Sequence, residues 1–235
     1  MKRLCTICAR GHSKGVLNKN IRVIGDKPLL AYSIIQAKAS GMFDCIAVSS
    51  DSSEILDTGL RWGADISINR PPALSSDNAP KIPAIRHCLE IAEQTTNIKF
   101  DVIADLDVTS PLREAQDIQG AIRLLIDHQA PNVITGTPSR RSPYFNMVEV
   151  HENGEVQVCK PLDRPFVRRQ DTPLCFDLNA SVYVWRRDCL LDSDSLFHPQ
   201  TLLYTMPMER SIDIDSEFDL ELVSLLLAKT GEKHG

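Results

Sequence analysis

A cluster of basic residues follows the first apolar run of the chain. Residues 7–20, ICARGHSKGVLNKN, contain two glycines and four basic residues but no acidic residue. The glycines let backbone amides approach a ligand closely, and Arg10, Lys14 and Lys19 would surround it with positive charge. Backbone N–H groups and fixed cations together neutralise the oxygens of a polyphosphate. The segment therefore predicts a polyphosphate-binding loop, although its composition alone would also suit a solvated loop.

A pair of acidic residues lies near the C-terminus. Asp213 and Asp215 alternate with Ile212 and Ile214, so both carboxylates lie on the same face of an extended segment. Paired carboxylates repel each other unless a cation lies between them, and a hard divalent ion that also binds phosphate oxygens suits this position. The spacing therefore predicts a metal site. The alternative is that Asp215 or Ser216 only caps the last helix.

Two loops that follow expected strands carry further polar residues. The first, RPPALSSD, runs from Arg70 to Asp77, and the second, DLDVTSPLR, runs from Asp105 to Arg113. Prolines mark both segments as loops or turns. Taken separately, each loop is more typical of a turn than of a binding site.

Short apolar runs alternate with helical patterns along most of the chain. We expect strands at residues 4–9, 45–49, 64–68, 102–106, 133–137, 182–185 and 203–206. We expect helices at residues 28–40, 52–63, 82–93, 114–128 and 218–229. This order is typical of βαβ units and predicts an α/β fold with a mostly parallel sheet. Ligands bind at the carboxyl ends of the strands in such sheets, so the polar segments should meet at one edge.

The segment at residues 138–175 departs from this pattern. It is polar, rich in arginine and proline, and poor in core residues. Within it, residues 147–158 alternate strictly around Asn153-Gly154, which is a strong hairpin signal. We interpret the segment as an arm inserted in a single domain of residues 1–235, with an apolar face that needs a partner.

Composition argues against several other classes of protein. Hydrophobic residues make up 43% and charged residues 24% of the chain, and the net charge of -5 argues against nucleic-acid binding. No run approaches the roughly 18 apolar residues of a membrane span, so we expect no membrane association. The seven cysteines lie mostly in apolar surroundings, as expected of free thiols in a reducing cytoplasm. The absence of GxxxxGK[ST] and GxGxxG argues against a Walker-type loop and a dinucleotide-dependent oxidoreductase.

Four motifs together carry a resemblance to a known family. ARGHSKGxxxKN after the first strand, RPPALSSD, TSPLR, and SIDID before the last helix resemble the cytidylyltransferases that activate nonulosonic acids. This family includes the CMP-sialic acid synthetases and their bacterial relatives acting on legionaminic acid, and the likeness runs from Leu4 to about Leu225. It implies a three-layer, Rossmann-like nucleotide-diphospho-sugar transferase fold. It also implies that residues 138–175 are the dimerisation arm of a homodimer.

The resemblance implies a reaction and its residues. CTP and a nonulosonic acid would give a CMP-sugar and pyrophosphate, with Mg2+ and without an organic cofactor. The residues with implied catalytic roles are Arg10, Lys19, Asp213 and Asp215, of which the two aspartates would bind the metal. The residues with implied substrate contacts are Arg10, Ser13, Lys14, Lys19, Asn20, Arg70, Asp77 and Asn179, and Arg168 and Arg169 would hold the sugar carboxylate.

Two departures from the sialic acid synthetases bear on the sugar. Asp107-Val108 stand where those enzymes usually carry glutamine-proline, and Lys81 stands where several of them have a small hydroxyl residue. We expect Asp107 to accept hydrogen bonds from the substrate; alternatively, it joins the metal site or holds a loop through Arg113. DLDVTSPLR looks more like the legionaminic acid branch, so we expect N,N'-diacetyllegionaminic acid as the sugar. N-acetylneuraminic acid is the alternative, and a non-catalytic nucleotide-sugar-binding protein is the remote one.

Overall fold

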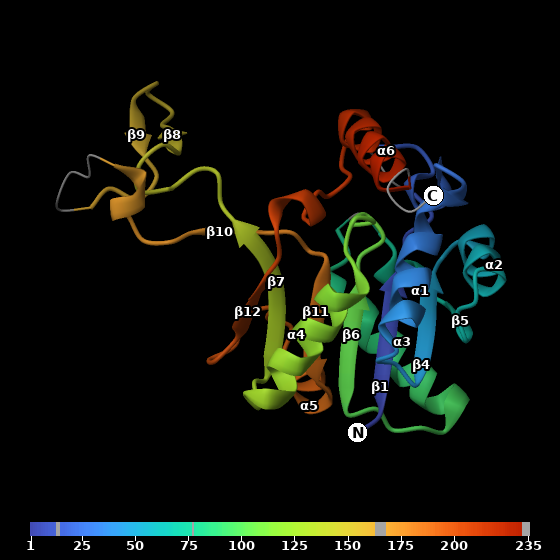
Figure 1. Ribbon diagram of the computed structural model, residues 1–235. Coiled ribbons are helices and arrows are strands. Elements are labelled where there is room, and N and C mark those ends of the chain that lie inside the picture. The colour runs from blue at the N-terminus through green and yellow to red at the C-terminus, as the bar shows by residue number, and fades with distance from the viewer. Residues whose placement is uncertain (13–14, 77, 163–167, 232–235) are drawn as a thin grey trace.

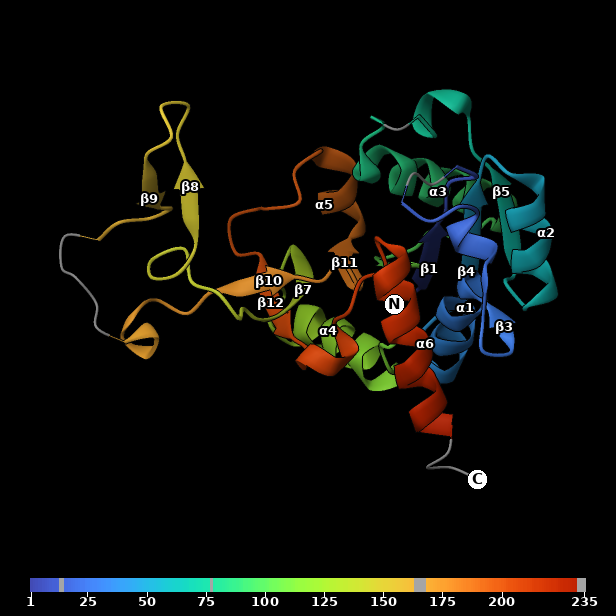
Figure 2. The same cartoon turned by 90° about the horizontal axis from the view of Figure 1, so that it is seen from above.

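The computed structural model describes residues 1–12, 15–76, 78–162 and 168–231. The body of the protein is a central sheet between two layers of helices, and an arm extends away from this body (Figures 1 and 2). The expected three-layer α/β fold with a mostly parallel sheet is therefore confirmed. None of the described helices has the length and apolar character that crossing a membrane requires.

The described residues form an eight-stranded main sheet with β1 (Arg3–Cys8) near its centre. β1 pairs in parallel with β4 (Cys45–Ser50) on one side and with β6 (Val102–Leu106) on the other. The remaining strands are β5 (Ile66–Asn69) beyond β4, and β11 (Val182–Arg186), β7 (Asn132–Pro138), β10 (Phe176–Leu178) and β12 (Leu202–Thr205) beyond β6. β10 and β11 run antiparallel to their neighbours, whereas β1, β4, β5 and β6 all end at the same edge.

Helices cover both faces of this sheet (Figure 2). One face carries α1 (Leu29–Ser40), α2 (Ser53–Arg61), α4 (Ala115–Asp127) and α6 (Glu217–Gly231), and the other carries α3 (Lys81–Thr96) and α5 (Arg187–Asp192). Successive strand residues point to opposite faces. Ile7 therefore joins the core under α1, and Leu4 joins the core under α3.

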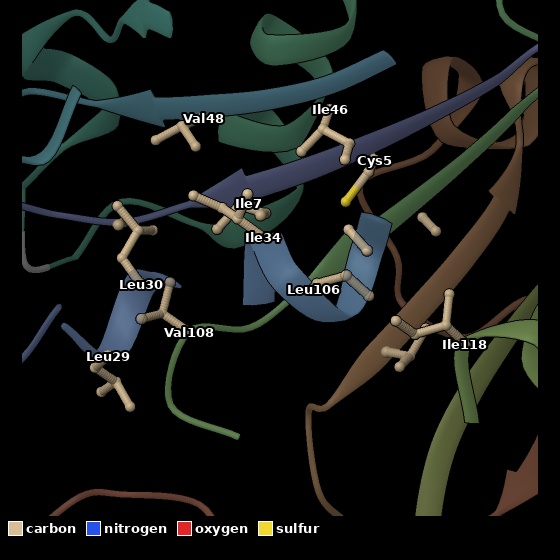
Figure 3. Packing of buried hydrophobic residues seen from close by; sticks show 14 of the residues in the cluster. Cys5, Ile7, Leu29, Leu30, Ile34, Ile46, Val48, Leu106, Val108 and Ile118 are labelled. Atoms are coloured by element: carbon tan, nitrogen blue, oxygen red, sulfur yellow. The ribbon is translucent and has the colours of Figure 1, made fainter. Parts of the chain in front are cut away.

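Helix α1 shows how the apolar pattern produces this packing. The helix begins after Pro28 and ends at Gly41, whose φ of 63° lies in the left-handed region that favours glycine. Leu30 and Ile34 are fully buried and pack beneath Ile7 of β1 (Figure 3). Burial of a side chain of this size contributes about 2 kcal/mol, so this face fixes the helix on the sheet.

All expected strands and helices occur within a few residues of their expected positions. The sequence did not predict β2 (Val23–Ile24), β3 (Lys27–Pro28), β10, α5, or the short 3-10 helices at Lys19–Ile21, Pro72–Leu74, Arg169–Asp171 and Met208–Arg210. These elements are three residues long or less, apart from α5, and they carry too few residues for a periodic pattern.

The arm leaves the body through β7 and returns through β10. These two strands pair at Phe176 and Pro138. Farther out, β8 (Val148–Val150) and β9 (Val156–Val158) form a separate two-stranded sheet, which confirms the expected hairpin. Figure 1 shows this hairpin, with the rest of the arm, apart from the main sheet and its helices.

The buried side chain of Arg113 connects the segment after β6 to α1 and to the residue before β11. The Arg113 side chain is 2% exposed and donates to Gln36 Oε1 at 2.9 Å, to Ser181 O at 2.5 Å and to Asp107 O at 2.6 Å. A further hydrogen bond reaches the Ser33 hydroxyl. Burial lowers the pKa of Arg113 to about 10. The guanidinium thereby joins α1, Asp107 directly after β6, and Ser181 directly before β11.

We expect Arg113→Met to destabilise the fold strongly. The substitution leaves several buried acceptors without their donor, and losses of this kind cost about 3 kcal/mol. Urea unfolding would measure the change in the free energy of unfolding. Arg123→Met, at an exposed position of α4, is the matched control and should change it by less than about 0.5 kcal/mol. Equal unfolding midpoints for the two variants would contradict this role of Arg113.

Candidate active site

A cleft of about 460 Å³ opens at the carboxyl ends of β1 and β6. Segments distant in the sequence meet there: the loop after β1, the loop after β5, the start of α3, the end of β6 and the segment before α6. The polar residues that line it are Arg10, His12, Lys19, Asn20, Arg70, Lys81, Asp107, Thr109, Asp213 and Asp215. The cleft therefore gathers most of the described residues that the sequence predicted for the site.

Buried polar side chains hold the loop that follows β1. Asn20 donates from Nδ2 to Arg10 O at 2.8 Å, and Arg70 donates from Nη2 to Ala9 O at 2.9 Å. Both side chains are almost fully buried, so they fix the loop backbone as well as line the cleft. Asp51 accepts a hydrogen bond from Gly11 N at 2.9 Å and lies 4.0 Å from the Arg70 guanidinium. These contacts thus hold the backbone of Ala9, Arg10 and Gly11, where the loop begins.

Lys19 connects this loop to the segment that carries the two aspartates. Its Nζ donates to Ile214 O at 2.5 Å and lies 3.5 Å from Asp215 Oδ1. Ile214 is fully buried, and its backbone N donates to Thr109 O at 3.0 Å. Because the Ile214 side chain points into the core, Asp213 and Asp215 on either side both line the cleft, as their alternation predicted.

Asp213 has the properties expected of a carboxylate that binds a cation. Its Oδ1 is buried and has no hydrogen-bond partner among the described residues. Burial raises the pKa of Asp213 above its ordinary value, against a hydrogen bond with the Thr109 side chain, and the negative charges of Asp107 and Asp215 act in the same direction as burial. A divalent ion would satisfy this oxygen and neutralise the charges. In the part of the chain that the structure describes, no three His, Cys, Asp or Glu residues are grouped for a metal.

Asp107 forms an ion pair on the wall of the cleft. Its Oδ2 lies 2.7 Å from Lys81 Nζ, and its Oδ1 accepts hydrogen bonds from the Thr109 backbone N at 3.2 Å and hydroxyl at 2.9 Å. Burial alone would raise the pKa of Asp107, but the charge of Lys81 and its hydrogen bond lower the pKa well below its usual range. Lys81 also lies 3.1 Å from Asp105 Oδ2. Asp107 is therefore already paired within the chain.

Asn179 lies apart from the lining of the cleft. Its side chain is 4% exposed; Oδ1 accepts from the Thr135 hydroxyl at 2.7 Å, and Nδ2 donates to the Ser211 hydroxyl at 2.9 Å. It precedes Ala180, whose φ of 51° interrupts the run from β10 to β11. The described contacts of Asn179 thus fix the break between two strands and the approach to Asp213.

Other predicted residues lie on the arm or outside the described residues. Arg168 lies on the arm and pairs with Asp171 through two contacts of 3.1 Å. Arg169 begins a 3-10 helix of the arm. Ser13, Lys14 and Asp77 lie outside the described residues.

The sequence did not assign roles to Lys81, Asp105 or Thr109. A buried aspartate inside the apolar run VIADL was one available signal, because a buried carboxylate requires a partner. A lysine at the first position of a helix was another, because the helix dipole disfavours positive charge there. Neither signal shows that Lys81 pairs with Asp105, since 24 positions separate the two residues in the chain.

A smaller apolar pocket of about 210 Å³ lies beside the cleft. It is lined by Pro80, Lys81, Ile82, Ile85, Tyr183, Trp185, Asp194 and Leu196. Lys81 and Pro80 line both spaces. The start of α3 thus forms the wall between a polar cleft and an apolar pocket.

This arrangement suits transfer of a nucleotidyl group. Positioning and charge neutralisation supply most of the rate in phosphoryl-type transfer. Arg10 and Lys19 bring cationic side chains to the cleft, and Asp213 and Asp215 bring two carboxylates. The fold and the cleft therefore define a nucleotidyltransferase.

Comparison with known proteins identifies the family. A family model described as Cytidylyltransferase matches residues 4–220. The chain belongs to the cytidylyltransferase family, among the CMP-nonulosonic acid synthetases, and the resemblance seen in its four motifs is confirmed. The protein is thus an enzyme of this family.

Three relatives align over nearly the whole chain. A Campylobacter coli protein named "Post-translational flagellin modification protein B" is 45% identical over 95% of this chain and 94% of its own length. The "CMP-N,N'-diacetyllegionaminic acid synthase" of Campylobacter jejuni serotype O:2 is 43% identical over 96% of this chain and 94% of its own. The "Pseudaminic acid cytidylyltransferase" of Campylobacter jejuni serotype O:23/36 is 33% identical over 96% of each chain.

Solved structures share the fold. CMP:2-keto-3-deoxy-manno-octonic acid synthetase complexed with CTP superposes with a TM-score of 0.70 over 98% of this chain and 100% of its own, at 15% identity. A 4-diphosphocytidyl-2C-methyl-D-erythritol synthase from Anaerococcus prevotii superposes with a TM-score of 0.64 over 97% and 96%, at 12% identity. Identities this low show the fold alone, and they agree with the Rossmann-like arrangement of the main sheet.

We expect Gly15→Ala to weaken binding of the cytidine nucleotide. A Cβ atom at Gly15 would lie 2.1 Å from Asp215 O, so the loop must move away from the aspartates. The KM for CTP should rise about tenfold, which corresponds to ~1.4 kcal/mol of lost binding. The free energy of unfolding should change little, because the loop lies at the surface.

Gly11→Ala in the same loop is the matched control. Its Cβ would lie 3.1 Å from Ser52 Cβ, a contact that a shift of a few tenths of an ångström relieves, whereas the 2.1 Å contact at Gly15 requires a much larger movement. The KM for CTP should therefore rise by less than about threefold. A larger effect at Gly11 than at Gly15 would show that the contact with Asp215 does not shape the site.

Proposed function

We propose that this enzyme makes CMP-N,N'-diacetyllegionaminic acid from CTP and the free sugar acid, with release of pyrophosphate. The observation that carries the choice of sugar is the apolar pocket beside the cleft. Ile82, Ile85 and Leu196 give the pocket an aliphatic wall that offers no hydrogen bond to a hydroxyl-rich sugar tail. Legionaminic acid has an additional N-acyl group and a deoxy C9, which suit apolar surroundings. The 43% identity with a relative named for this product supports the same choice.

The chain's own residues would bind and orient the two substrates. Arg10 and Lys19 would neutralise phosphate oxygens, together with backbone amides of the loop after β1. The anomeric hydroxyl would attack the α-phosphorus as the bond to the leaving pyrophosphate breaks. The polar cleft would hold the triphosphate, and the apolar pocket behind Lys81 would hold the acylated tail of the sugar.

We further propose that Asp213 and Asp215 hold a Mg2+ ion. The buried, unpaired Oδ1 of Asp213 supports this assignment, as does the position of both carboxylates on one wall of the cleft. Mg2+ keeps most of its ligands as water or phosphate oxygens, so two protein carboxylates suffice. When bound, the ion would stabilise the charge that spreads over the phosphates.

We expect the enzyme to prefer N,N'-diacetyllegionaminic acid to N-acetylneuraminic acid. A site built to bind a terminal hydroxyl rejects a deoxy sugar strongly, whereas an apolar pocket excludes an additional hydroxyl only about 100-fold. Competition of the two sugars at equal concentration and saturating CTP would give the ratio of kcat/KM. Slow conversion of N-acetylneuraminic acid to its CMP derivative should be detectable. A ratio that favours N-acetylneuraminic acid would replace the proposed sugar, and a ratio that favours pseudaminic acid in a third arm would do the same.

We also propose that the protein is a two-fold homodimer through its arm. Val148, Val150 and Val156 on one face of the hairpin are 53%, 69% and 65% exposed. A two-stranded hairpin is marginally stable alone in water, and a second copy of the chain is the commonest partner. In the dimer, Arg168 and Arg169 would approach the partner's cleft and bind the sugar carboxylate.

We expect the dimer to depend on the valine face of the hairpin. Val150→Asp places a charge in the proposed interface, which costs several kcal/mol, so the variant should sediment as a monomer at micromolar concentration. Gln157→Asp adds the same charge on the opposite face of the hairpin, so this control should remain a dimer. A wild-type protein that sediments as a fully active monomer would remove the arm from the assembly.

A further inference from the structure

Lys81 occupies an unusual position for a lysine. It is the first residue of α3, directly after Pro80, where the helix dipole disfavours a positive charge. Its Nζ lies 2.7 Å from Asp107 Oδ2 and 3.1 Å from Asp105 Oδ2, and 4.9 Å from the centre of the Tyr183 ring. An ammonium group thus lies between two carboxylates and over an aromatic face. This is the type of surrounding that also suits a bound cation.

The two carboxylates depend on this ammonium. Asp105 is 1% exposed; its Oδ1 accepts from the Thr6 hydroxyl at 2.8 Å, and its Oδ2 has no hydrogen-bond donor among the described residues. Among those residues, the ion pairs of Asp105 and Asp107 are all made by Lys81. Burial alone would lower the pKa of Lys81, but the charges of Asp107 and Asp105 raise it above its usual range. Lys81 therefore stays charged and neutralises part of this acidic pair.

The pair is connected to the proposed metal ligands. Asp107 Oδ1 holds Thr109 through its backbone N and its hydroxyl, and Thr109 O accepts from Ile214 N at 3.0 Å. Ile214 separates Asp213 from Asp215. A change at Lys81 would thus act on the aspartates through a short series of contacts.

We propose that Lys81 is a positioning residue that serves as a built-in cation for Asp105 and Asp107, and so leaves the divalent ion to Asp213 and Asp215. The proposal rests on the metal site proposed above. It means that Asp107 is not a metal ligand in this enzyme, although it lies in the same cleft. It also means that the start of α3 sets how many divalent ions the cleft accepts.

Binding of Mn2+ to the protein without nucleotide tests the proposal. The electron paramagnetic resonance signal of free Mn2+ gives both the affinity and the number of bound ions. Lys81→Met should bind Mn2+ about tenfold more tightly than wild type, or bind an additional ion, because the buried Asp105 and the partly exposed Asp107 have lost their cation. Lys81→Met/Asp107→Asn should lose this gain. Unchanged Mn2+ binding by a folded Lys81→Met protein would overturn the proposal.

Lys27→Met is the matched control. Lys27 also pairs with an aspartate, Asp26, and lies 5.3 Å from the centre of a tyrosine ring, but it is not among the residues that line the cleft. Its substitution should leave Mn2+ binding unchanged. A gain equal to that of Lys81→Met would show that loss of any surface lysine has this effect, which would also overturn the proposal.

Asp107→Asn decides the question even if Lys81→Met does not fold. If Lys81 already neutralises Asp107, this variant should keep the Mn2+ affinity of wild type within about threefold, whereas loss of a true ligand would cost tenfold or more. A tenfold loss would overturn the proposal. Asp213→Asn tests the proposed metal site separately. Wild-type Mn2+ affinity in this variant would refute that site, and the Mn2+ affinities of the Lys81 variants could still be compared with wild type.

Discussion

The backbone of Ile214 is the point at which the site is assembled. Its N–H donates to the carbonyl of Thr109 in the turn after β6, its carbonyl accepts from Lys19, and its side chain lies in the core. Three segments that lie about a hundred residues apart are thereby brought within hydrogen-bond distance. Ile214 thus positions the backbone of both aspartates, and the contact of Lys19 with the Asp215 carboxylate adds to this. The segments that line the cleft are thus connected to the core through Ile214.

The charges of the cleft are largely arranged before substrate binds. Arg70 and Asn20 hold the loop backbone, Arg113 holds the backbone of Asp107, and Lys81 holds its carboxylate. Preorganised groups of this kind lose little entropy when the ligand arrives, and they need not reorient as charge develops. The exception is Asp213, whose buried oxygen has no described partner. The Mg2+ site that we propose depends on this oxygen.

The sequence predicted the features that depend on local patterns. Periodicity placed the strands and helices, and simple alternation placed Asp213 and Asp215 on one face, because Ile214 belongs to the core. Such patterns could not predict contacts between residues that are distant in the chain. Nothing in the sequence pairs Lys81 with Asp105, and nothing near Asn179 shows that the break at Ala180 turns its amide toward Thr135. These features arise from tertiary packing, which propensity does not encode.

The pairing of β7 with β10 closes the arm at its base. For the body of the enzyme, residues 139–175 behave as one long hairpin loop whose two ends are held together by a ladder from Phe176 to Leu178. The entropy of closing such a loop rises only slowly with its length. Insertions, deletions or exchange of whole segments beyond the ladder therefore impose little strain on the catalytic body. The same body can in this way carry arms of different lengths and compositions, and its assembly can diverge while its chemistry is retained.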